Sequence, residues 1–324
     1  MLATITIMRP EILDARFGDG STFKASDNFV RNWVRRELKW TQRKATRAAQ
    51  KMPNNWEDLC ERSALRKAYI FKEYDIKNAG LYVNSDQTQV LYAPGDKLTY
   101  AEIGQKQVSL VGGEEKRAFT LMVGVASDGT LLPFQAIYEG KTKQSTPSSG
   151  SPHYNDLIRA GMLLEFSGTT TYWSNLAMMK SYVKNILDPY FSGVRARLGL
   201  PPTQKAVWQI DVWSVHRSKE FRAWMSENYS NIILDYVPGG CTGVAQPCDV
   251  GIQRPLKLSI KRSYHEFMVK DMITQIDDGA ATIFFDKKVG KVRDASVGWL
   301  WNAYQAINNP ELVKKVILTM RALL

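Results

Sequence analysis

The chain contains the stretch Gly240-Cys241-Thr242-Gly243-Val244-Ala245-Gln246-Pro247-Cys248-Asp249-Val250-Gly251, which decides how the rest is interpreted. One acidic residue, Asp249, closes a loop rich in Gly and Pro and opens a long basic segment with helical periodicity. Considered alone, Asp249 would be interpreted as a solvated residue at a helix N-terminus. In combination with other acids it becomes a candidate metal ligand.

Two further acids end short apolar runs. Asp86 follows residues 81–85, and Asp211 follows residues 206–210. The crevice beyond the carboxyl ends of strands is where α/β sheets bind their ligands, so both positions suit a binding site. Each is also an ordinary place for a solvated strand-end residue. The three positions together favour the site.

Carboxylates at such a site suit one particular chemistry. Mg²⁺ prefers oxygen ligands and keeps several waters, so two or three carboxylates leave room for substrate oxygens. Three converging carboxylates repel one another unless cations lie between them. Two cations about 4 Å apart clamp the attacking and leaving oxygens of an in-line displacement at phosphorus.

The sequence motif around each acid resembles the corresponding motif of the DDE superfamily of the pogo, jerky and centromere-protein-B type. The family's first motif, N-x-D-[EQ]-T, is matched by Asn84–Thr88, and its third, Q-P-x-D-x-G, by Gln246–Gly251. The second acid ends a hydrophobic strand and is followed by small residues and His, as Asp211 is by His216. The resemblance spans residues 26–318. Val212 stands where the family commonly has Asn.

The resemblance implies a transposase or transposase-derived endonuclease that binds double-stranded DNA and cleaves and joins phosphodiester bonds. Asp86, Asp211 and Asp249 would be its catalytic residues and would hold two Mg²⁺ or Mn²⁺ ions. It also implies a nuclear protein, and leaves a homodimer open. Two alternatives stay open: a domesticated, catalytically inactive DNA-binding protein, and a nuclease acting on RNA or hybrids.

Composition and charge agree with a nucleic-acid partner. The 324 residues are 44% hydrophobic, as in globular proteins, and carry a formal net charge of +11. An excess of this size favours a polyanion such as nucleic acid or an acidic membrane surface. No apolar run approaches the length of a membrane span, so we expect an intracellular, soluble protein with no membrane partner. The three Cys lack paired C-x-x-C spacing, which argues against a zinc module or a disulfide framework.

The positive charge is concentrated near the N-terminus. Ser26 is a candidate N-cap for a helix with an apolar stripe, and Thr41 for a second helix through Gln50. The pair resembles the later half of a helix-turn-helix module, and an ordinary solvated pair of basic helices is the alternative. The candidate DNA-binding residues are Arg31, Arg35, Arg36, Lys39, Arg43, Lys44 and Arg47.

The remaining pattern predicts an α/β fold, an RNase H-like mixed sheet flanked by helices and preceded by this partial helix-turn-helix segment. Residues 1–75 would form the DNA-binding segment and a linker helix, and residues 76–324 the DDE catalytic domain with closing C-terminal helices. Predicted strands cover 81–86, 120–126, 131–138, 206–211 and 232–237. Predicted helices cover 56–74, 175–190, 219–228, 250–273 and 299–323.

Two polar residues have ordinary expected roles. His216 follows Asp211 closely enough to reach a phosphate or a water, or it lies at the N-terminus of a surface helix. Asp235 lies inside an apolar strand, and we expect it to be structural and to face solvent at a sheet edge.

Overall fold

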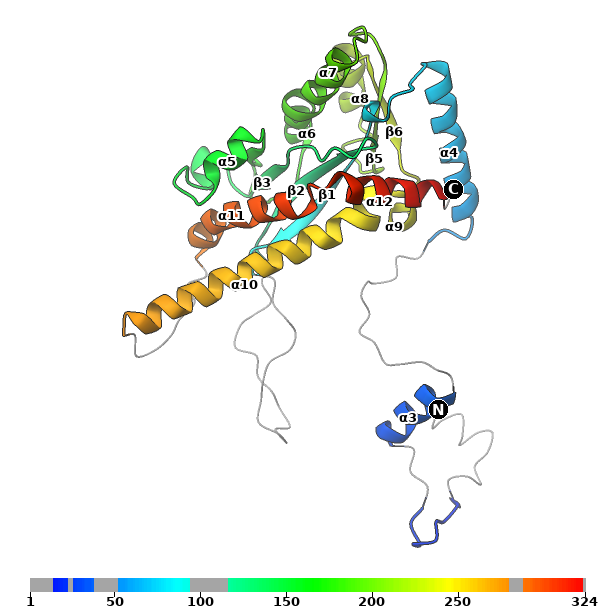
Figure 1. The fold of residues 1–324 in the computed structure, drawn as a ribbon, viewed down its shortest axis with the longest axis vertical. Coiled ribbons are helices and arrows are strands. Elements are labelled where there is room, and N and C mark those ends of the chain that lie inside the picture. Colours follow the sequence, from blue (N-terminus) through cyan, green and yellow to red (C-terminus); the bar gives the residue numbers. More distant parts are fainter. Residues whose placement is uncertain (1–13, 23–25, 38–51, 94–115, 280–287, 323–324) are drawn as a thin grey trace. The chain divides into compact units, whose positions relative to one another are not determined.

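The computed structural model describes residues 14–22, 26–37, 52–93, 116–279 and 288–322 (Figure 1). The chain divides into two units, Met1–Gln50 and Lys51–Leu324. The second unit contains the sheet and all of the acidic candidates.

A six-stranded sheet with the order β4-β3-β2-β1-β5-β6 forms the centre of the second unit. Strand β2 pairs antiparallel with β1 and β3, whereas β1–β5, β5–β6 and β3–β4 are parallel. The predicted mixed α/β sheet is therefore confirmed. Its strands are β1 (Tyr82–Leu91), β2 (Ala118–Ala126), β3 (Gln135–Tyr138), β4 (Leu163–Phe166), β5 (Ala206–Ile210) and β6 (Ile232–Tyr236).

Helices cover both faces of the sheet (Figure 1). Two π-helical turns interrupt them, Val183–Leu187 between α6 and α7 and Cys248–Ile252 before α10. The helices of this unit are α4 (Trp56–Glu73), α5 (Tyr154–Arg159), α6 (Leu176–Tyr182), α7 (Asp188–Arg197), α8 (Lys219–Asn228), α9 (Thr242–Ala245), α10 (Gln253–Asp277), α11 (Val289–Ile307) and α12 (Pro310–Ala322).

Strand β2 separates the two main hydrophobic cores because its side chains alternate between the faces. Phe119 and Leu121 pack with α10 and α11 in one core, whereas Met122 packs with α6, α7 and α8 in the other. All nine residues of β2 are buried. Because β2 is packed on both faces, it holds its neighbour β1 in place along their shared ladder of hydrogen bonds. Strand β1 contains the first acid, Asp86.

The predicted strand 131–138 is shorter in the structure. Leu131 makes only an isolated bridge to Val125, and regular pairing of β3 starts at Gln135. Pro133 lies between them and has no N–H to donate to a ladder, which explains the interruption. Gly129, at φ +101, supplies the turn that the Asp-Gly pair predicts.

The first unit contains α3 (Asp27–Glu37). The Phe29 amide donates to Ser26 Oγ at 3.2 Å, so the predicted N-cap is confirmed. Arg31, Arg35 and Arg36 lie in this helix, and the last two are exposed. The other basic candidates, Lys39, Arg43, Lys44 and Arg47, and the predicted second helix lie outside the described residues.

The helix-turn-helix assignment and the division of the chain at residue 75 therefore stay predictions. Helix α4, the predicted linker, belongs to the same unit as the sheet. Within the described ranges, no helix has both the length and the apolar character needed to cross a bilayer.

Candidate metal centre

The first two acids lie on neighbouring parallel strands. Asn84 of β1 is in register with Gln209 of β5, and Asp86 and Asp211 each follow two residues later. Because adjacent strands are about 4.8 Å apart, this register brings the two acids close together. Asp86 does not end its strand as the apolar run suggested. It lies within β1, opposite Val123 of β2.

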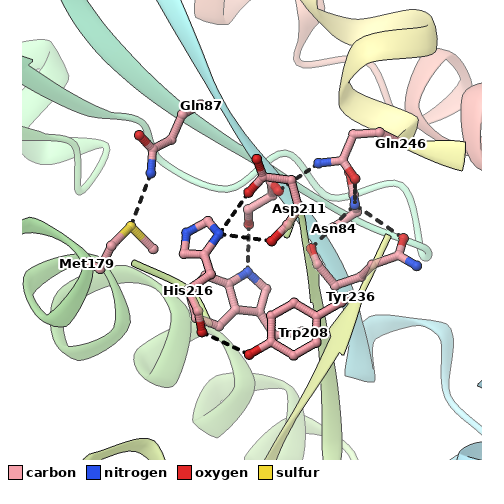
Figure 2. Close-up of polar contacts among 10 residues, drawn as sticks. Asn84, Gln87, Met179, Trp208, Asp211, His216, Tyr236 and Gln246 are labelled. Carbon is pink, nitrogen blue, oxygen red and sulfur yellow. Dashed lines mark hydrogen bonds and ion pairs between the residues drawn. The ribbon is translucent and has the colours of Figure 1, made fainter. Parts of the chain in front are cut away.

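The third acid, Asp249, lies in the π-helical turn before α10. Two buried amides tie this turn to β1 (Figure 2). Asn84 Nδ2 donates to Gln246 Oε1 at 3.0 Å, and Gln246 Nε2 donates to the Ser85 carbonyl at 3.0 Å. The Cys248 amide donates to Asn84 Oδ1 at 3.2 Å. The Asn and Gln of the two motifs thus place Asp249 beside Asp86.

Gly251, the glycine of the third motif, allows helix α12 to approach the backbone of this turn closely. A Cβ atom at Gly251 would collide with the side chain of Val316 in α12. Helix α12 therefore packs directly on the turn that carries Asp249 and supports it.

The buried amides predict a stability effect. Asn84→Ala should lower the free energy of unfolding by at least about 2 kcal/mol, because the Cys248 amide and Gln246 would lose buried hydrogen-bond partners. Chemical denaturation measures this. The exposed Asn185→Ala should change stability by less than about 0.5 kcal/mol, and equal losses in both variants would contradict the role given to Asn84.

Electrostatics show that the three acids share one region. Burial raises the pKa of Asp86 well above its usual range, and the negative charges of Asp249 and Asp211 raise it further. The Asp249 carboxyl also interacts with Asp86 through a hydrogen bond. Gln253 Nε2 donates to Asp86 Oδ2, and Thr88 Oγ1 orients Gln253 by donating to its Oε1 at 3.0 Å.

The carboxylate of Asp211 is held by a buried histidine (Figure 2). His216 Nδ1 lies 2.8 Å from Asp211 Oδ1 and 3.1 Å from the Asp211 carbonyl. His216 is 1% exposed and packs against Trp208 and Trp213. Of the two roles considered for His216, the surface position is therefore wrong. Donation to a carboxylate places the proton on Nδ1, so this residue orients Asp211.

Lys257 of α10, an exposed residue that belongs to none of the three motifs, is a further charged group near the site. Partial burial lowers its pKa, while the charges of Asp249 and Asp86 act in the opposite direction. The spacing in the sequence could have indicated this position, because Asp249, Gln253 and Lys257 recur every four residues and such residues share a helix face.

The donor chemistry fits a hard divalent cation, because mutually repelling carboxylates are stabilised by one. The three carboxylates are not arranged as a complete set of ligands around one metal ion. Within the part of the chain that the structure describes, no group of three or more His, Cys, Asp or Glu side chains is placed to hold a metal ion. Asp86 and Asp249 interact directly, while Asp211 is bonded to His216. Their assignment as joint ligands stays a prediction.

The family model for DDE superfamily endonucleases matches residues 116–314. Two curated relatives are described as pogo transposable elements with a KRAB domain. The human protein is 25% identical over 256 residues, covering 76% of this chain and 37% of the relative. The mouse protein is 24% identical over 207 residues, covering 64% of this chain and 30% of the relative. The chain thus spans about a third of the length of these relatives.

Among solved structures, the Mos1 mariner paired-end complex with Mn matches with a TM-score of 0.50 at 13% identity. The match covers 92% of this chain and 68% of that one. At this identity the likeness concerns the fold, and it supports the RNase H-like assignment.

Proposed function

The chain belongs to the DDE superfamily of endonucleases, and from this membership we propose that it binds double-stranded DNA and cleaves and joins phosphodiester bonds, as a transposase or transposase-derived endonuclease. One observation carries the proposal: the register of β1 and β5 sets Asp86 beside Asp211, and the Cys248 amide, next to Asp249, donates to Asn84 of the same strand.

In this proposal Asp86, Asp211 and Asp249 hold two Mg²⁺ or Mn²⁺ ions. The bound ions would supply Lewis acidity at the phosphate and lower the pKa of the attacking water or 3′ hydroxyl. The chain itself fixes the carboxylates. Gln253 orients Asp86, His216 orients Asp211, and the amides of Asn84 and Gln246 place the turn of Asp249.

The DNA partner is proposed on charge and on family membership. The net charge of +11 favours a polyanion, and the basic residues 31–47 would contact the duplex, as a partial helix-turn-helix segment. The solved structure with a similar fold, that of Mos1 mariner, is a paired-end complex, and we therefore extend the proposal to a homodimer. A nuclear location completes it.

A nicking assay tests the proposed function. The full chain should nick a DNA duplex with Mg²⁺ or Mn²⁺ and stop when the ion is chelated, while an RNA–DNA hybrid is left intact. Val212 beside the second acid and the incomplete cage favour one second candidate, a DNA-binding protein that does not cut. That protein would bind the duplex in a salt-dependent way without metal-dependent nicking, and this result would overturn the enzyme proposal.

His216 gives a prediction specific to the enzyme. His216→Phe keeps a buried ring but removes the hydrogen bond to Asp211, so nicking should slow by about 10- to 100-fold, as for other groups that orient a metal ligand. Duplex affinity, measured by fluorescence anisotropy, should be unchanged. The control His265→Phe removes an exposed histidine of α10 and should nick at the parent rate. Unchanged nicking by His216→Phe would show that Asp211 needs no such support.

A further inference from the structure

One tryptophan of the sheet unit faces solvent. Trp173, in the segment that leads into α6, is 57% exposed. Every other tryptophan that the structure describes is buried or partly buried. An indole ring has a large apolar surface, which folding normally removes from water. An exposed tryptophan is therefore a candidate contact for a partner if its position is fixed.

The segment around Trp173 is fixed to the sheet on one side and to α6 on the other. Thr120 Oγ1 of β2 donates to the Tyr172 carbonyl at 2.7 Å. Gln89 Nε2 of β1 donates to the Tyr172 hydroxyl at 2.6 Å. Asn175 caps the N-terminus of α6 with its side chain. The backbone is thus anchored both before and after the exposed tryptophan.

The indole ring is also supported by its neighbour. The rings of Tyr172 and Trp173 pack with their centroids 5.1 Å apart, at an interplanar angle of 34°. A single exposed apolar residue needs no functional explanation. A ring held in one orientation differs, because little conformational entropy is lost when a partner binds to it. Trp173 therefore has the properties of a binding surface that is formed in advance.

The tryptophan lies near the strand that contains the first acid. Gln89, which bonds Tyr172, follows Asp86 by three residues, roughly 10 Å at strand spacing. The two side chains point to opposite faces of β1. Strand β5 pairs only with residues 82–84 of β1, so among the described residues the edge formed by 85–91 has no strand beside it. A ligand that crosses this edge can reach both Asp86 and Trp173.

We propose that Trp173 stacks on one unpaired nucleobase of the bound DNA, a few nucleotides from the phosphate at the three acids. The inference rests on the proposed function, which supplies the DNA. A span of roughly 10 Å corresponds to about three nucleotides of a stacked strand. Every base has a flat π face, so an aromatic side chain can stack on any of them.

The proposed contact makes the chain selective for the state of the DNA and not for its sequence. A base inside a duplex must first be unpaired and unstacked, and this cost offsets much of the gain from stacking on the indole. A base that is already unpaired stacks without that cost. The contact therefore favours DNA with unpaired bases near the position of cleavage.

Fluorescence anisotropy with one labelled duplex, either blunt or extended by a single-stranded tail of about six nucleotides, tests this in the full chain without divalent ions. The parent chain should bind the tailed form at least about fivefold more tightly than the blunt form. Trp173→Ala should lose this preference, and Trp173→Phe should keep part of it. The control Tyr69→Ala removes an exposed aromatic residue of α4 and should keep it in full. Equal affinity of all four proteins for the blunt duplex shows that each variant is folded.

A 2-aminopurine base placed in the tail reports on stacking itself, because its fluorescence is quenched when it stacks on an aromatic ring. The parent chain and Tyr69→Ala should quench it, and Trp173→Ala should not. Quenching and tail preference that survive in Trp173→Ala would overturn the inference and leave the proposed function standing.

Two other results would also decide against the inference. Equal binding of blunt and tailed duplexes by the parent chain would leave Trp173 as a contact for a protein. An equal loss of affinity for both forms in Trp173→Ala would indicate a contact to the DNA backbone. A parent chain that binds neither form would refute the proposed function itself, and the inference with it.

Discussion

The Asp249→Asn variant is expected to nick duplex DNA at least about 1,000-fold more slowly than the parent chain, equivalent to about 4 kcal/mol of transition-state stabilisation. Asn has nearly the shape of Asp but lacks the negative charge that a divalent ion requires. Rate measurements with saturating Mn²⁺ and unchanged duplex affinity would separate this loss from a binding defect.

The same substitution should stabilise the metal-free fold, because it removes a charge that acts on the buried Asp86 carboxyl. A rise in Tm of about 2–4 °C would correspond to about 1 kcal/mol. The control Asp277→Asn makes the same change at the exposed end of α10 and should alter neither Tm nor nicking. A nicking rate near that of the parent in Asp249→Asn would remove this residue from the catalytic set.

Replacing Arg66 by Met should lower the free energy of unfolding by about 3 kcal/mol, because it leaves a buried charge uncompensated. Arg66 Nη2 of α4 lies 2.6 Å from Asp235 Oδ1, and the Asp235 side chain is 0% exposed. Gln209 Nε2 donates to the other Asp235 oxygen at 2.9 Å, and Gln209 contacts Asn84 in turn. The ion pair thus ends a buried polar network that reaches the candidate site.

Chemical denaturation of Arg66→Met and Arg62→Met provides the comparison. Arg62 forms an exposed pair with Asp58 one turn earlier on α4, so its loss should change stability by less than about 0.5 kcal/mol. Adding Asp235→Asn to Arg66→Met should recover part of the loss, because the unpaired charge disappears. Equal effects of the two arginine variants would show that Asp235 is not stabilised by Arg66.

The sequence motifs identified the three acids, but they could not show which hydrogen bonds position the carboxylates. Asn84 and Gln246 belong to the motifs, yet their contact joins residues far apart in the sequence. Local patterns contain no information on such contacts, because they form only when β1 and the turn before α10 pack. His216 is a similar case, since its burial depends on Trp208 and Trp213.

Asp235 was placed correctly in a strand and wrongly at a solvent-facing edge. Strand β6 does lie at the edge of the sheet, but Arg66 of α4 bonds both the Asp235 carboxylate and the Tyr236 carbonyl. The periodicity of α4 predicted a helix without indicating which strand it contacts. The partner of a helix is a tertiary property that a local pattern does not contain.

Short and uncapped elements were the ones missed. Strand β4 has four residues, each only partly buried, so it lacks the alternation that identifies a strand. Helix α11 begins at Val289, ahead of the expected Trp299, and its N-cap Lys288 makes no side-chain capping bond. Helix α8 has the predicted bounds and β2 nearly so, whereas β1 was recognised but extends to Leu91, beyond its predicted end at Asp86.

The positions of Mn²⁺ ions in crystals of the full chain, located by anomalous scattering, test the central claim most directly. The account predicts two peaks about 4 Å apart that contact Asp86, Asp211 and Asp249 between them. Peaks that leave Asp211 bonded only to His216, or no peak at the three acids in an ion-saturated crystal, would contradict it.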